Sequence, residues 1–141
     1  MHVKLYISPS RYIYELQHEF NHAFPFLRLE FFRIHRIEAA ADAMQVVTKT
    51  SLLRAAGVKS CGYILITEQT TVAELAAELR EKYGLIAQVV RQSGNVWLET
   101  TMTEDWTLIR QNEHGRELSN QLSLHQSPEG DITQCRNLPD Q

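Results

Sequence analysis

The chain has 141 residues, of which 43% are hydrophobic and 22% are charged, and its formal net charge is -3. This is the size and composition of one average globular domain, so collagen-like, wholly disordered and disulfide-scaffold proteins are excluded. A mildly acidic chain has no general attraction to nucleic acid or to an anionic membrane surface. The composition therefore predicts a globular domain and indicates no class of ligand.

The expected location follows from the cysteines and from the absence of targeting signals. Cys61 and Cys135 match no spacing typical of a metal or redox site. The N-terminal segment alternates polar and apolar residues, unlike a signal peptide, and no window approaches the roughly 18 apolar residues of a membrane span. We therefore expect a cytoplasmic protein without a membrane segment.

The first part of the chain predicts a βαβ unit. Residues 2–7 alternate in polarity, as a strand does, and an amphipathic helix with Ser10 as its N-cap follows over residues 10–23. A second strand is expected at residues 26–34, where the adjacent Phe31 and Phe32 predict a bulge or a strand end. Residues 36–60 are compatible with helix, loop or hairpin arm, and the pattern leaves these open.

The next part predicts a second βαβ unit followed by a hairpin. The apolar run at residues 63–66 is typical of a central strand with both faces covered. Residues 71–84 begin with a capping box and end with a glycine, which predicts a helix. Strands are expected at residues 85–92 and 96–101, because a Ser-Gly-Asn turn separates two β-rich runs.

Two βαβ units with one-sided helices predict an α+β fold. We expect a two-layer ferredoxin-like (split βαβ) sandwich, with the helices on one face of a mixed four- or five-stranded sheet. The alternative is a ubiquitin-like β-grasp fold, whose hairpin would come from residues 26–48. Few apolar residues follow residue 118, so we expect a single domain at residues 1–118 and a polar, flexible C-terminal tail at residues 119–141.

Residues 18–22, with the sequence HEFNH, match the H-E-x-x-H motif of zinc metalloproteases. In that motif the two histidines, here His18 and His22, bind zinc, and the glutamate, here Glu19, is the general base. A zinc-dependent hydrolase built on these residues is the alternative function that the sequence offers.

Three features oppose a catalytic zinc at this motif. Both histidines lie opposite the apolar stripe of the predicted helix, and little chain remains to build the second wall of a cleft. Pro25 and Arg28 stand where the extended motif needs glycine and histidine. We therefore interpret the histidines as solvated side chains on an exposed helix face and expect no cofactor.

Residues 99–106 carry three carboxylates and three hydroxyls, which could form a cation site or an acid/base pair. A helix explains most of this cluster without function, with Thr103 as its N-cap, acidic residues in its first turn, and an end at about His114 before Gly115. Trp106 would then anchor this helix on the sheet.

RNA binding is a third hypothesis, because basic and aromatic residues are interspersed between residues 26 and 36 and ferredoxin-like sheets can stack bases. Residues 1–37 contain only five basic against three acidic side chains, and no RNP-like run is present. Nucleic acid is therefore disfavoured as a partner.

No set of residues forms a convincing active site, so we expect a non-enzymatic module that binds proteins. Its partner would be a second copy, giving a homo-oligomer such as a homodimer, or another protein held by an open sheet face or an edge strand. Trp97 and Glu99 on the last expected strand, with Trp106 after it, are the interface candidates.

Overall fold

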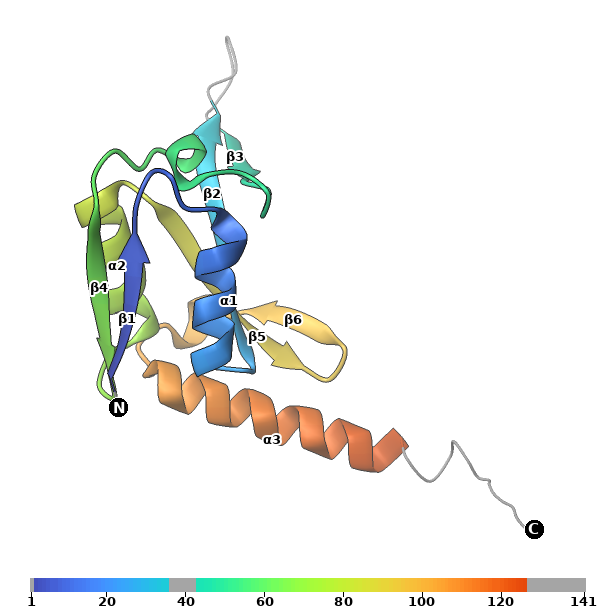
Figure 1. Cartoon of the computed structure of the whole chain (residues 1–141). Helices are drawn as coiled ribbons and strands as arrows, with labels where there is room; N and C mark the ends of the chain where they lie inside the picture. Colours follow the sequence, from blue (N-terminus) through green and yellow to red (C-terminus); the bar gives the residue numbers. More distant parts are fainter. Residues whose placement is uncertain (1, 36–42, 127–141) are drawn as a thin grey trace.

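The computed structural model of the protein describes residues 2–35 and 43–126. Figure 1 shows how the helices and strands of this part of the chain are arranged. In chain order they are β1 (His2–Ile7), α1 (Ile13–Ala23), β2 (Leu27–His35), β3 (Ala43–Val46), η1 (Leu53–Ala56), β4 (Gly62–Thr67), α2 (Val72–Tyr83), β5 (Ile86–Ser93), β6 (Val96–Glu99), η2 (Thr101–Thr103) and α3 (Leu108–Gln126).

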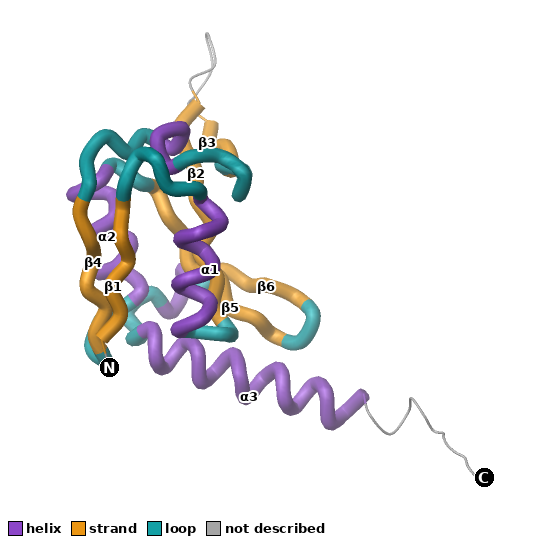
Figure 2. The backbone as a smooth tube through the Cα atoms, viewed as in Figure 1, coloured by secondary structure: helices purple, strands orange, loops and turns teal. Residues whose placement is uncertain are grey.

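The strands form two antiparallel sheets. β1 pairs with β4, and the second sheet has the order β3-β2-β5-β6. The first strands of the two βαβ units therefore pair with each other, and so do their second strands. In Figure 2 the β1–β4 pair stands apart from the larger sheet, and α1 lies between the two.

The α+β class is confirmed, and each unit has its strand, helix and strand in the expected chain order. The two strands of each unit lie in different sheets, however, and the ferredoxin-like arrangement is not confirmed. The expected single mixed sheet is replaced by two sheets in which every pairing is antiparallel. The hairpin of the β-grasp alternative is present as β2 and β3, although β2 also pairs with β5 in the antiparallel sense. The strands form two sheets because the core lies between them, so each sheet turns one apolar face towards it.

Each sheet turns one apolar face inward. Burying one large aliphatic or aromatic side chain is worth about 1.5–3 kcal/mol, so these faces and the helix stripes supply most of the stabilisation. The fully buried side chains include Leu5 and Ile7 of β1, Ile64 and Ile66 of β4, Leu27, Leu29 and Phe31 of β2, Ile13, Leu16 and Phe20 of α1, and Leu75 and Leu79 of α2.

Two strand predictions are corrected by this burial pattern. β2 runs without a break through Phe31 and Phe32, because Phe31 enters the core and Phe32 faces outward. β4 is covered on one face only, since Tyr63 and Leu65 are exposed while their neighbours are buried. An uninterrupted apolar run therefore marks a strand here whose outer face is itself apolar.

Helix α2 has the ends that its sequence predicts. The N–H of Glu74 donates to Thr71 Oγ1 at 3.1 Å, and the N–H of Thr71 donates to the Glu74 carboxylate at 2.9 Å. Gly84 ends the helix with a φ of 66°. The capping box and the glycine stop are both confirmed.

The acidic cluster after β6 forms a turn against α2 and does not begin a helix. The carbonyls of Glu104 and Trp106 accept hydrogen bonds from the N–H groups of Ala73 and Val72 at 2.9 and 3.1 Å. The predicted helix start at Thr103 is therefore wrong. The reason is tertiary, because this turn satisfies N–H groups that the first turn of α2 leaves free.

Helix α3 begins later and runs further than the sequence predicts. Thr107 Oγ1 accepts from the N–H of Arg110, and the helix continues from Leu108 through Gly115 to Gln126. It thus enters the segment expected to be a tail, and residues 127–141 of that segment lie outside the described residues.

Buried polar contacts fix α3 on the larger sheet. Gln111 is fully buried, and its Oε1 accepts from Arg91 Nη1 at 2.8 Å. Asn112 Oδ1 accepts from the backbone N–H of Phe26 at 2.8 Å. Desolvation lowers the pKa of the Arg91 guanidinium, which remains a cation and depends on Gln111 for its hydrogen bond.

Gly115 lies inside α3 because the helix touches the sheet there. A side chain at this position would place its Cβ 3.0 Å from Phe26 Cβ and from Arg91 Cγ. This contact explains why a glycine that would stop an isolated helix is retained within one.

We expect Gly115→Leu to lower the free energy of unfolding by about 2 kcal/mol, because it overpacks the contact between α3 and the sheet. Urea denaturation measures the change. Asn120→Leu is the matched control, since Asn120 is exposed on the same helix. Equal stability of the two variants would contradict the close approach at Gly115.

Candidate functional site

A groove opens where β6 leaves the edge of β5. β6 pairs with β5 only from Val90 to Ser93, so the half of β5 from Ile86 to Val89 has no strand on that side in the described chain. After Glu99 the chain turns away, and Thr100 Oγ1 donates to the Val89 carbonyl at 2.8 Å. The bond to Thr100 fixes the point at which the open edge begins.

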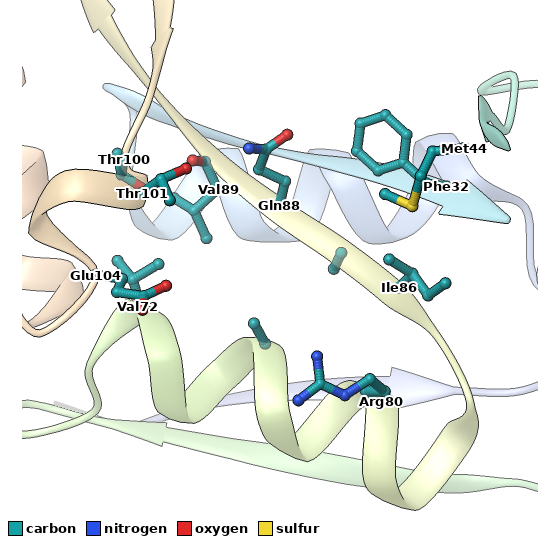
Figure 3. Close-up of a pocket in the computed structure, with 12 residues that line it drawn as sticks. Phe32, Met44, Val72, Arg80, Ile86, Gln88, Val89, Thr100, Thr101 and Glu104 are labelled. Atoms are coloured by element: carbon teal, nitrogen blue, oxygen red, sulfur yellow. The ribbon is translucent and has the colours of Figure 1, made fainter. Parts of the chain in front are cut away.

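Helix α2 forms the opposite wall of this groove. Val72, Ala76 and Arg80 are four residues apart and face β5, as Figure 3 shows for Val72 and Arg80. The space between the walls has a volume of about 250 Å³. The small side chain of Ala76 at the middle of the wall keeps the groove open.

The two ends of the groove carry opposite charges. Arg80 lies beside the Ile86 end of β5, and Glu104 lies beside Val72 and Thr101 at the other end (Figure 3). Both charged side chains are exposed, and neither has an ion-pair partner among residues 2–35 and 43–126. The groove thus has one charged side chain at each end, with the Gln88 amide and mainly apolar side chains between them.

The outer face of the larger sheet carries a second feature, which we call the apolar patch: Phe32, Ile34, Met44 and Val46. The register places Phe32 beside Val46 and Ile34 beside Met44 on the same face. Ile34, Met44 and Val46 are 56%, 59% and 55% exposed, and no helix of the described chain covers them. These four uncharged side chains form a hydrophobic surface that remains in contact with water.

Two of the three predicted interface residues lie on this same outer face, at the end away from the patch. The Arg28 guanidinium stacks 4.5 Å from the Trp97 ring centroid and pairs with Glu30. Glu99 Oε1 accepts from Gln88 Nε2 at 2.7 Å. Here the face is a polar strip with both signs of charge.

Trp106 lies elsewhere, at the turn before α3. Its ring contacts the Arg110 guanidinium at 3.8 Å and meets His114 edge-on at 5.4 Å. The structure therefore brings Trp97 and Glu99 together on one face and leaves Trp106 apart from them.

The H-E-x-x-H residues lie on α1, with both histidines exposed. Glu19 is held by Arg11, whose Nη1 and Nη2 lie 3.2 and 2.6 Å from the two carboxylate oxygens. This hydrogen bond raises the pKa of Arg11, which also donates to the Tyr6 carbonyl at 2.9 Å. Glu19 thus holds the turn after β1 through Arg11.

A metal centre needs more ligands than α1 supplies. Within the described ranges, no three His, Cys, Asp or Glu side chains are grouped so that they could hold a metal ion. Cys61 is exposed, with its Sγ 3.8 Å from Ser8 Oγ. His18 and His22 therefore offer at most a two-ligand surface site.

The basic residues of the RNA hypothesis are dispersed. Arg28 is stacked on Trp97, while Arg33 Nη1 lies 3.4 Å from the carbonyl of Ala55 on η1. Arg36 lies outside the described residues. The described part of this segment thus shows no row of basic side chains along one face.

No protein-family model, curated protein or solved structure matches the chain. Function is therefore inferred from the surfaces of this chain alone. None of the helices in the described ranges combines the length and the hydrophobicity that crossing a bilayer requires.

Neither the groove nor the apolar patch is expected from the sequence. Ala76 belongs to the apolar stripe of its helix by pattern, and Arg80 has the spacing of an ordinary surface residue. Met44 and Val46 fall in the segment for which no element could be chosen. Ile34 was the one available indication of the patch, because it lies two residues after Phe32 and therefore on the same outward face of the strand.

We expect untagged protein, purified without added metal, to retain less than about a tenth of an equivalent of zinc, because two exposed histidines lack the affinity of a structural site. Plasma emission spectroscopy measures the content. The double variant His18→Ala/His22→Ala should give the same value and the same melting temperature. A full equivalent that the double variant loses would instead support the zinc hydrolase.

Proposed function

We propose that this protein is a non-enzymatic protein-binding module that associates with a second copy of itself through the apolar patch. The observation that carries the proposal is the exposure of Ile34, Met44 and Val46 on a sheet face that no described helix covers. An exposed apolar surface on a sheet costs free energy in water and is typical of an interaction site.

Charge favours a second copy as the partner. A twofold dimer brings identical surfaces together, so a patch with charged members would meet its own charge. The four patch residues are all uncharged. The adjacent strip contains Arg28 together with Glu30 and Glu99, so it presents both signs at the border of the contact.

The area available indicates a weak dimer. Ile34, Met44 and Val46 are about half covered, so the complete burial of each gains about 1 kcal/mol, and Phe32, which is more deeply buried, adds no more than that. Two copies together gain at most about 8 kcal/mol, from which an association cost of at least about 4 kcal/mol must be subtracted. We therefore expect a dissociation constant of about 1 mM.

The same proposal places the module in the cytoplasm without a cofactor. An exposed free thiol such as Cys61 is retained most readily in a reducing compartment.

Val46→Lys should weaken self-association at least tenfold, because it places a charge in a contact that must lose its water. Val96→Lys is the matched control, since Val96 is also a strand valine with 55% exposure and lies on the opposite face of the same sheet. Sedimentation velocity up to about 1 mM chain measures both. A wild-type chain that stays monomeric throughout, or equal effects of the two substitutions, would reject the dimer.

A further inference from the structure

We propose that the groove between β5 and α2 binds the C-terminal end of an extended peptide, which adds to β5 as an antiparallel strand. This site shares Phe32 and Met44 with the edge of the apolar patch, but its walls are the open edge of β5 and the face of α2 that carries Ala76 and Arg80, and Ile34 and Val46 of the dimer contact lie outside it.

The first support is a set of unused backbone groups. The N–H of Gln92 donates to Phe26 on the β2 side, so peptide groups of even-numbered residues in β5 face β2 and those of odd-numbered residues face the other edge. The Val89 carbonyl confirms this alternation, because it faces away from β2 and bonds Thr100. The N–H and C=O of Ala87 and the N–H of Val89 therefore point into the groove.

None of these three groups has a hydrogen-bond partner among the residues that the structure describes. A strand lying about 4.8 Å from β5 would satisfy all of them. It would occupy the position that β6 would fill if β6 continued past Glu99. The groove is thus the vacant place of a strand beside an existing sheet.

The second support is the length and lining of the groove. The open edge spans Ile86 to Val89, which is about 13 Å at the rise of a β-strand and suits three or four residues. Apolar side chains of Phe32, Met44 and Ile86 border it on the sheet side. The volume of about 250 Å³ is just below the usual range of ligand pockets, so the side chains that enter the groove must be small.

The third support is the charge at the two ends, which sets the direction and favours a chain terminus. A strand antiparallel to β5 runs from the Val89 end towards the Ile86 end, so its last residue reaches Arg80 (Figure 3). A terminal carboxylate there meets an exposed guanidinium that has no ion-pair partner in the described chain, and such pairs are strong and directional. Glu104 lies at the opposite end of the groove, beside the N-terminal side of the bound segment.

The probes for the test are two pools of random hexapeptides, one with a free C-terminal carboxylate and one with a C-terminal amide. Peptides retained by the immobilised wild-type chain are identified by mass spectrometry, and the best are titrated in solution. We expect the free-acid form of a selected peptide to bind at least about tenfold more tightly than its amide. The amide signals of Ala87 and Val89 should shift in the NMR spectrum when it binds.

Variants separate this site from a general sticky surface. Ala76→Leu should abolish binding by filling the groove, while Ala77→Leu on the same helix should bind like the wild type, because Ala77 does not line the groove. Arg80→Gln should remove the difference between acid and amide, and Arg54→Gln, at an exposed arginine outside the groove, should keep it. Val46→Lys should leave peptide binding intact even where it abolishes the dimer.

Three results would overturn the proposal. They are the absence of any peptide enriched on the wild type over Ala76→Leu, equal affinity for acid and amide, and NMR shifts confined to the apolar patch.

Discussion

The pairing of β2 with β5 is the interaction on which the rest of the structure depends. It joins the second strands of the two βαβ units over six residue pairs, from Leu27 opposite Arg91 to Phe32 opposite Ile86. All three α-helices pack on one or both of these strands. Both proposed surfaces lie beside it. The apolar patch is on the outer face where β3 pairs with one end of β2, and the groove lies where β6 leaves the edge of β5 uncovered.

Those parts of the fold that depend on local signals could be predicted from the sequence. The capping box of α2, the glycine that ends it and the alternation of β1 are properties of neighbouring residues. The division into two sheets could not be predicted, because it depends on which strands pair across the chain. Tyr63 and Leu65 show the difficulty, since a strand of only apolar residues gives no sign that one of its faces meets water.

Local spacing was also insufficient at the candidate sites. The histidines of α1 have the sequence separation of zinc ligands, but the carboxylate of Glu19 between them is hydrogen-bonded to Arg11, which precedes the helix. Glu104 has the position of a first-turn helix residue by sequence, and in the fold its carbonyl caps a different helix. Trp97 and Glu99 were placed usefully because strand and face follow from alternation alone. The chemistry of each of these side chains depends on partners from distant segments, which a single sequence does not identify.

The long separation between paired strands has a consequence for how the chain folds. His2 pairs with Thr67, and Leu27 pairs with Arg91, so β1 and β2 must wait for much of the chain before these partners exist. The entropy cost of closing such long loops arises before the new contacts compensate it, which slows folding relative to a helical protein of the same size. During synthesis the apolar strands of the first unit are exposed near the ribosome until β4 and β5 emerge. Because the two units complement each other, we expect two nascent chains that exchange them to form a domain-swapped pair as the misfolded product.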